Sequence, residues 1–174
     1  QIASLKQAIS LGARDPRLYL ELGSNLLQEG DSDNGLAYLQ QARELSDQSP
    51  QFLNNLVDIY LMRNFHQQAL DELENLRQQT PEDISLYVKM SRIYQSRQMF
   101  EEGLEVLNQA RVVAPQDLSI TLEIARLYMA CEDFAQVIAI LQEARQTNPG
   151  NNEISSIISE AYARTGDHEM AILE

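Results

Sequence analysis

The sequence has no tryptophan, a single cysteine and no hydrophobic run longer than a few residues. Because Cys131 has no second cysteine to pair with, an internal disulfide is excluded and a cysteine-based metal site is not expected. The short apolar runs exclude a membrane-spanning helix. No basic, apolar leader follows Gln1, so we expect a soluble fragment of a longer protein, and the sequence leaves open whether it is cytoplasmic or periplasmic.

Residues that carry chemistry are also scarce. His66 and His168 are the only histidines, they are widely separated, and neither is near Cys131. The seven glycines are scattered and form no phosphate-binding loop. An enzyme needs a nucleophile, an acid–base pair or a metal cluster held in one place. We therefore expect no catalytic residue, no metal site and no cofactor, and interpret both histidines as helix-start or packing residues.

Positive charge is in deficit, because 13 Lys and Arg face 26 Asp and Glu and the formal net charge is −13. Such a surface repels phosphate backbones and anionic lipids, so neither nucleic acid nor a membrane surface is an expected partner. The chain is 44% hydrophobic and 22% charged. That composition is ordinary for a soluble helical protein and too apolar for a disordered one.

Proline spacing is the first sign of a repeat. Three of the four gaps between the five prolines are 34 residues and one is 31: Pro16, Pro50, Pro81, Pro115 and Pro149. The odd gap disappears when the chain is written in blocks of 34 residues that start at Pro16, Pro50, Ile84, Leu118 and Asn152. The last three prolines then all occupy block position 32, which indicates repeating units without an insertion.

Chemically similar residues recur at fixed block positions. Position 7 is always large and apolar: Leu22, Leu56, Met90, Ile124 and Ile158. Position 11 is a leucine and then four tyrosines: Leu26, Tyr60, Tyr94, Tyr128 and Tyr162. Position 24 is leucine throughout: Leu39, Leu73, Leu107 and Leu141. Positions 8, 20 and 27 are mostly small, which lets helices approach closely while the large residues fill the remaining space.

Each block contains two stretches with the apolar spacing of an amphipathic helix. Polar breaks separate them, as at Glu29-Gly30-Asp31, where Gly suits a left-handed helix end and Asp an N-cap. The Asn34-Gly35 pair would elsewhere indicate a β-hairpin. It falls inside a helical stretch here, so we interpret Gly35 as a close-packing contact. A pair of such helices cannot bury its apolar stripe alone, so neighbouring pairs must stack.

These columns resemble the tetratricopeptide repeat family, whose pattern has an aromatic residue at position 4, Gly at 15 and Pro at 32 beside the positions above. The chain has Tyr19 and Tyr87 at position 4 and Gly30 and Gly166 at position 15. It departs from the pattern with Leu at position 24 and with Asp47 in place of the first proline. The resemblance implies an all-α fold, a right-handed α-solenoid of antiparallel helix pairs.

We expect one continuous solenoid domain. Residues 1–15 would be the second helix of a preceding partial repeat. The full repeats would be 16–49, 50–83, 84–117 and 118–151, followed by a truncated repeat at 152–174. Ile2, Leu5, Ile9, Ile172 and Leu173 would then be partly exposed at the two ends, which predicts self-association.

The resemblance also implies that the first helix of each repeat lines a concave groove. Ten charged residues fall at groove-facing positions, five of each sign, so the groove has no net charge. Lys89, Arg92 and Arg126 form a local basic cluster beside Asn54 and Asn55. Amides could hold a peptide backbone and guanidinium groups a carboxylate. The predicted partner-binding groove comprises Arg17, Asn54, Asn55, Asp58, Lys89, Arg92, Gln95, Glu123 and Arg126. A simpler interpretation is that the bases only balance Asp58 and Glu123.

Two narrower hypotheses are weighed against this groove. Chaperone-binding members of the family clamp a carboxylate with specific Lys and Asn residues, but Leu20, Ser24 and Ser85 stand at three of those positions, so a chaperone-tail receptor is not expected. Position 28 is always arginine: Arg43, Arg77, Arg111 and Arg145. We interpret this row as pairing with helix C-terminal dipoles, with a basic ladder for an acidic partner as the alternative.

The preferred functional hypothesis is a non-catalytic scaffold that binds a peptide segment or partner protein in the concave groove. The alternative is a structural or spacer segment of a larger assembly, such as bacterial envelope, secretion or exopolysaccharide-export machinery, that associates through its edges or ends. An RNA-binding helical repeat is disfavoured by the 34-residue period and the acidic charge.

Overall fold

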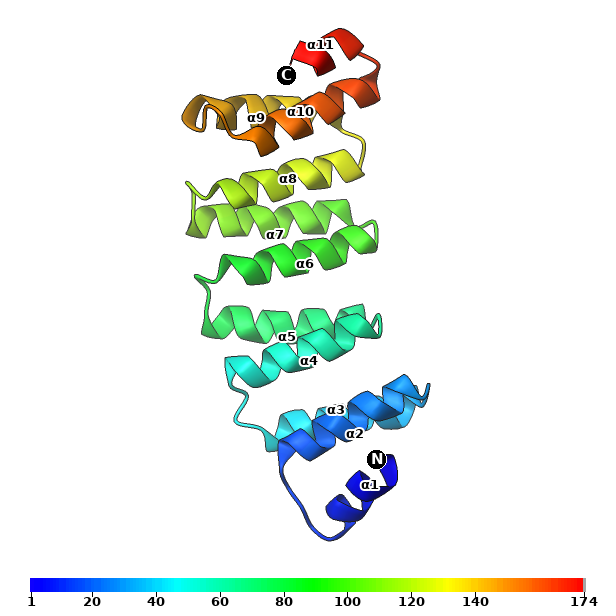
Figure 1. Ribbon diagram of the computed structural model, residues 1–174. Helices are drawn as coiled ribbons and strands as arrows, with labels where there is room; N and C mark the ends of the chain where they lie inside the picture. The colour runs from blue at the N-terminus through cyan, green and yellow to red at the C-terminus, as the bar shows by residue number, and fades with distance from the viewer. Residues whose placement is uncertain (174) are drawn as a thin grey trace. The chain divides into compact units, whose positions relative to one another are not determined.

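A computed structural model describes residues 1–173 of the chain, and every regular element in that range is an α-helix (Figure 1). The chain forms two compact units, Gln1–Thr80 and Pro81–Glu174. The first unit contains α1 (Ile2–Ser10), α2 (Pro16–Gln28), α3 (Ser32–Leu45), α4 (Pro50–Met62) and α5 (His66–Gln79). The second contains α6 (Ile84–Ser96), α7 (Phe100–Val113), α8 (Leu118–Ala130), α9 (Phe134–Thr147), α10 (Asn152–Thr165) and α11 (His168–Leu173). The all-α solenoid class expected from the sequence is confirmed.

The predicted helix starts are also confirmed, since α2, α4, α6, α8 and α10 begin at the first residues of the blocks. Capping explains these starts. Asp83 and Asp117 each accept a hydrogen bond from the backbone N–H two residues later, and proline occupies the first turn of α2 and α4. Gly30 and Gly166 lie in the left-handed region with φ of 88° and 83°, so neither is inside a helix. The division into repeats and their continuity as one solenoid stay predictions.

The position-4 tyrosines fasten the start of each first helix to the segment before it. The Tyr19 hydroxyl donates to the Ala13 carbonyl at 3.1 Å, and the Tyr87 hydroxyl donates to the Pro81 carbonyl at 2.9 Å. Both rings are buried. A buried phenol needs such a partner for its hydroxyl, so the aromatic residue fixes the entry of the chain as well as filling space.

Two glycines allow a close crossing of α2 and α3 in the first unit. A Cβ on Gly23 would lie 2.9 Å from the Gly35 carbonyl oxygen, and one on Gly35 would lie 2.5 Å from a methyl carbon of Leu27. Helices α2 and α3 therefore touch backbone to backbone, which confirms the interpretation of Gly35 as a packing contact. Leu39 fills the adjoining space and is fully buried.

Helix α1 packs against α2 in the first unit. Leu5 joins Leu22 and Leu26 in a buried cluster, with Ile2 and Ile9 packed around it. The expectation that Leu5 would be partly exposed is therefore wrong, because α2 covers it, whereas Ile2 and Ile9 are half-buried as expected.

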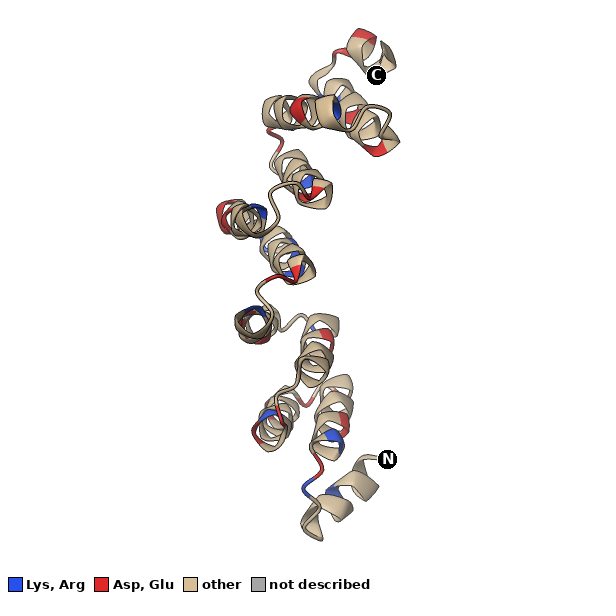
Figure 2. Ribbon diagram, turned by 90° about the vertical axis from the view of Figure 1, so that its left-hand side faces the viewer, with Lys and Arg blue, Asp and Glu red and all other residues tan. Residues whose placement is uncertain are grey.

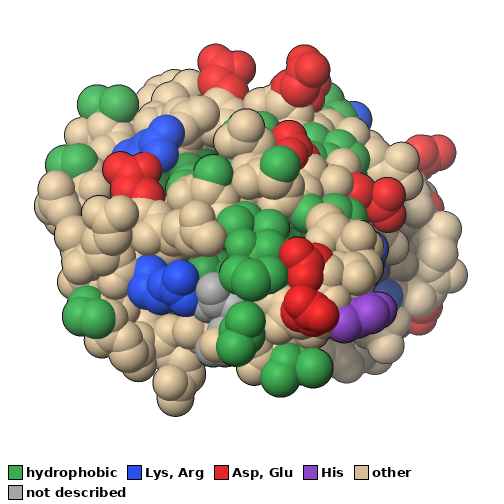
Figure 3. Space-filling model, turned by 90° about the horizontal axis from the view of Figure 1, so that it is seen from above, with side chains coloured by type: hydrophobic (Ala, Val, Ile, Leu, Met, Phe, Trp, Pro, Cys, Tyr) green, Lys and Arg blue, Asp and Glu red, His purple; other side chains and the backbone are tan. Residues whose placement is uncertain are grey.

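The helices of the second unit form two layers, with α6 and α8 side by side and α7 in the other layer (Figure 2). Its C-terminal part is held by one cluster of fully or nearly fully buried residues from α8, α9 and α10: Leu122, Ala125, Val137, Leu141, Ile154, Ile158 and Ala161. At its far end Ile172 and Leu173 are exposed. The view from above shows hydrophobic side chains gathered near the middle of this face with acidic side chains beside them (Figure 3).

Most of the predicted core is buried. Seven of the predicted positions are no more than 5% exposed: Leu56, Tyr60, Leu73, Met90, Leu107, Ile124 and Leu141. Tyr94 and Tyr128 are only half-buried, which corrects the expectation for these two. Both lie in the last turn of a first helix, and a tyrosine at such a position can pack its ring while its hydroxyl stays near water.

Candidate functional site

The groove positions of the second unit lie on its first helices. Lys89, Arg92 and Gln95 are on α6, Glu123 and Arg126 are on α8, and α10 adds Glu153. Helix α8 contacts both α6 and α10, so these three helices form a continuous layer. The N-caps described above fix where α6 and α8 start and therefore which residues occupy the predicted groove positions.

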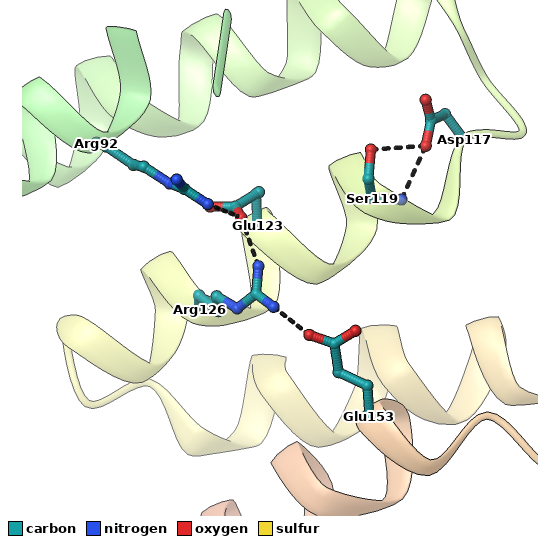
Figure 4. A network of polar contacts seen from close by, with 6 residues as sticks. All are labelled: Arg92, Asp117, Ser119, Glu123, Arg126 and Glu153. Carbon is teal, nitrogen blue, oxygen red and sulfur yellow. Dashed lines mark hydrogen bonds and ion pairs between the residues drawn. The ribbon is translucent and has the colours of Figure 1, made fainter. Parts of the chain in front are cut away.

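Four charged side chains of this layer form a chain of ion pairs (Figure 4). Arg92 donates to Glu123 through Nη2 at 2.6 Å and through Nε at 3.3 Å. Arg126 also donates to Glu123, and its other terminal nitrogen donates to Glu153. Three helices are thereby linked by alternating charges in the order Arg92, Glu123, Arg126 and Glu153.

Glu123 is the centre of this network because its side chain is only 10% exposed, whereas the Arg92 side chain is 62% exposed. A buried carboxylate needs paired donors, and the two arginines supply them. The hydrogen bond to Glu123 also raises the pKa of Arg92, which keeps its guanidinium charged. The two arginines of the basic cluster are therefore paired with carboxylates, and Glu123 balances them as the simpler interpretation of the sequence expected.

A hollow of about 400 Å³ adjoins the network between α6 and α8. Ile84 and Val88 supply apolar lining, and Lys89, Arg92, Asp117 and Glu123 supply polar groups. The Asp117 carboxylate is already occupied by the Ser119 N–H and hydroxyl at 2.9 and 2.7 Å. Arg92 also lines a second hollow of about 600 Å³ with Gln95 and Phe100. Arg92 thus borders both hollows.

The remaining predicted groove residues belong to the first unit. Arg17 is exposed on α2 and pairs with Asp15 at 3.5 Å. Asn54 donates to the Pro50 carbonyl of its own helix at 2.9 Å, and Asn55 and Asp58 are exposed on α4. The prediction that these residues share one binding surface with Lys89, Arg92 and Arg126 stays a prediction.

Sequence reasoning did not include Ile84 and Phe100 in the site. Both stand at helix starts, Ile84 opening α6 and Phe100 opening α7. A helix-start position predicts packing, and only the arrangement of neighbouring helices reveals that these side chains border a hollow. No sequence signal identifies them.

The arginines of position 28 all lie in the last turn of a second helix. Arg43 pairs with the buried carboxylate of Glu72 at 2.8 Å, and Arg77 pairs with Glu74 at 2.7 Å. Arg111 donates to Asn108 at 2.7 Å. Their positions fit the helix-end interpretation, and the pairing of Arg43 with Glu72 adds a contact between α3 and α5.

Within residues 1–173 no group of three or more His, Cys, Asp and Glu side chains is arranged to hold a metal ion. His66 and His168 are the first residues of α5 and α11, as predicted for helix-start residues. In the same range, none of the helices combines the length and the apolar character that crossing a membrane requires.

Residues 26–91 match the model of the tetratricopeptide repeat family. This part of the chain carries tetratricopeptide repeats. Such repeats generally act as protein-interaction scaffolds without catalytic activity of their own, and their partners are proteins or peptides. No curated protein sequence matches the chain.

Solved tetratricopeptide repeat structures share the fold. TTC0263, a thermophilic protein of Thermus thermophilus, is 24% identical, with a TM-score of 0.58 over 91% of this chain and 87% of that one. MamA of Desulfovibrio magneticus RS-1 is 18% identical, with a TM-score of 0.61 over 91% and 90%. YrrB, described as a tetratricopeptide repeat protein with an unusual peptide-binding site, is 15% identical, with a TM-score of 0.57 over 99% and 89%.

Proposed function

We propose that this chain is a non-catalytic scaffold that binds an extended segment of a partner protein along α6 and α8. The observation that carries the proposal is the hollow between these helices, where apolar side chains lie beside polar groups held in fixed positions. Pockets that combine an apolar lining with a few convergent polar groups are the usual form of a binding site. The peptide-binding site in the name of YrrB, a protein of similar fold, supports the same function.

Arg92 would be the main polar contact of the partner segment. Its Nε and one terminal nitrogen are directed at Glu123, so the guanidinium is held in one orientation. An arginine has five N–H donors in a rigid fork, and the remaining ones are available at its exposed edge. A backbone carbonyl or a carboxylate of the segment could accept them, while an apolar side chain fills the space beside Ile84 and Val88.

The paired charges also predict the kind of recognition. Because Glu123 and Glu153 neutralise Arg92 and Arg126, the layer offers oriented hydrogen bonds with little net charge. Binding should then weaken only modestly with salt, since long-range attraction is what salt screens most. A free basic cluster would give a much steeper salt dependence.

Panning a phage library of random peptides against the whole chain tests this proposal. Peptides that bind along α6 and α8 should lose about tenfold or more in affinity with Arg92→Ala, because a directed hydrogen bond to a charged group is lost. Arg97→Ala is the matched control, since Arg97 is exposed at the end of the same helix and lines neither hollow. Equal affinities for both variants and the original chain would reject the proposal.

A second candidate function, self-association within a larger assembly, is favoured by the exposed apolar side chains of Ile172 and Leu173. At high concentration, the variant with serine at both positions should then have a lower sedimentation coefficient than the original chain. A single monomer boundary for the original chain would contradict this alternative.

A further inference from the structure

A third hollow lies between the C-terminal parts of α7 and α9 and the start of α8. Its volume is about 350 Å³. Pro115, Leu118, Ile140 and Ala144 make its lining partly apolar, and the connection from α7 to α8 closes one side. The start of α8 also contributes to the lining, and Asp117 is the one residue that this hollow shares with the hollow between α6 and α8.

The two helical walls of this hollow carry opposite charges. Arg111 of α7 is exposed, and its Nη2 is directed by the Asn108 side chain at 2.7 Å. Glu143 of α9 is exposed on the other wall, and among residues 1–173 nothing donates a hydrogen bond to its carboxylate. Asp117 also borders the hollow, but Ser119 occupies its carboxylate. One oriented cation and one available anion therefore flank a hollow whose lining is partly apolar.

Exposed apolar residues follow directly after Arg111. Val112 is 84% exposed and Val113 is 43% exposed, at the last two positions of α7. Polar residues are the usual choice at an exposed helix end, because an apolar side chain there gains nothing from water. These two valines do not line the hollow, but they add exposed apolar surface to the end of α7 that carries Arg111.

We infer that this face of the second unit is a docking surface for a protein segment in which a large apolar side chain stands between an acidic and a basic residue. The apolar side chain would occupy the hollow, the acidic residue would pair with Arg111 and the basic residue with Glu143. The hollow is open rather than enclosed, which suits a side chain presented by a protein surface more than a free small molecule. Opposite charges on the two walls fix the direction of the bound segment.

The test is a random peptide library on phage, panned against the whole chain. One class of selected peptides should carry the acidic, apolar, basic order. Exchanging the charges with Arg111→Glu and Glu143→Lys should lower the affinity of this class about tenfold or more. Each charged residue of the peptide then faces a residue of the same sign. Panning against the exchanged variant should select the reverse order. Panning against the exchanged variant selects new peptides, so its result does not depend on how tightly the first peptides bind.

Two controls separate this surface from the groove. Arg97→Glu with Glu105→Lys makes the same pair of charge changes at exposed positions outside the hollow and should leave the class unaffected. Arg92→Ala should likewise leave it unaffected, even where it abolishes binding along α6 and α8. If no peptide class depends on Arg111 and Glu143, or if the exchanged variant selects the same order as the original, the inference is wrong whatever the outcome for the groove.

Discussion

Arg92 reaches from α6 to α8 and donates two hydrogen bonds to the carboxylate of Glu123, one through Nη2 at 2.6 Å and one through Nε at 3.3 Å. The carboxylate is nearly buried and the guanidinium is mostly exposed. Removing the arginine should therefore affect stability differently from removing the carboxylate. The exposed arginine can be hydrated again, whereas the buried carboxylate cannot.

This asymmetry gives the first prediction. Arg92→Ala together with Arg126→Ala leaves the Glu123 carboxylate without these donors and should lower the free energy of unfolding by about 2–3 kcal/mol. Glu123→Gln leaves two solvent-accessible arginines and should cost about 1 kcal/mol or less. Urea denaturation of the three proteins measures the difference. Equal costs would mean that Glu123 is better hydrated than its burial indicates.

The crossing of α2 and α3 gives the second prediction. Gly35→Ala places a Cβ 2.5 Å from a Leu27 methyl carbon and 3.1 Å from the Gly23 carbonyl oxygen, so the helices must move apart. The expected loss of stability is about 1–3 kcal/mol. Gly103→Ala is the control. Its Cβ would approach only the far end of the Leu127 side chain closely, at 3.0 Å, and its other contacts would be at ordinary van der Waals distance. The midpoint temperature of thermal unfolding should be clearly lower for Gly35→Ala than for Gly103→Ala.

The leucine of position 24 gives the third prediction. Leu107 is fully buried on α7, so Leu107→Ala leaves a cavity and should cost about 2–5 kcal/mol. Val112→Ala on the same helix removes a side chain that is 84% exposed and should cost less than about 0.5 kcal/mol. Chemical denaturation checks both values. A cost for Leu107→Ala as small as that for Val112→Ala would show that position 24 is not a core column.

Tyr60 gives a prediction about alkaline pH. Burial raises its pKa to about 12, the negative charge of Glu72 adds to the shift, and the positive charge of Arg43 partly opposes it. An unfolded tyrosine ionises near pH 10. The neutral phenol therefore contributes stability that is fully present below about pH 10 and is lost as the pH rises from about 10 to about 12.

Tyr60→Phe removes this ionisation. Its free energy of unfolding should fall less between about pH 10 and pH 12 than that of the original chain, as followed by urea denaturation at each pH. Tyr38→Phe, at a half-buried site on α3, controls for the loss of a hydroxyl. Parallel pH profiles for the original chain and Tyr60→Phe would refute the assignment.

Repetition made the helices easy to predict. Proline and aspartate mark the helix starts, and recurring leucines such as Leu73 and Leu107 mark the core. The same residue types recur because each block packs its helices in the same way. The pairing of Arg92 with Glu123 was open in the sequence, which supported both a basic cluster and a balanced one. Side-chain pairing depends on how far apart neighbouring helices lie, and columns do not encode that distance. The hollow beside Arg111 depends on the same spacing.

The central claim is that a partner segment docks along α6 and α8. Nuclear magnetic resonance of the whole chain, titrated with a peptide whose binding depends on Arg92, tests it most directly. The account predicts that the methyl signals of Val88 and the Nε–H signal of Arg92 shift on binding, because both residues line the hollow, while the methyl signals of Val112 and Ile140 stay unchanged. Shifts confined to Val112 and Ile140, with Val88 and Arg92 unaffected, would contradict it.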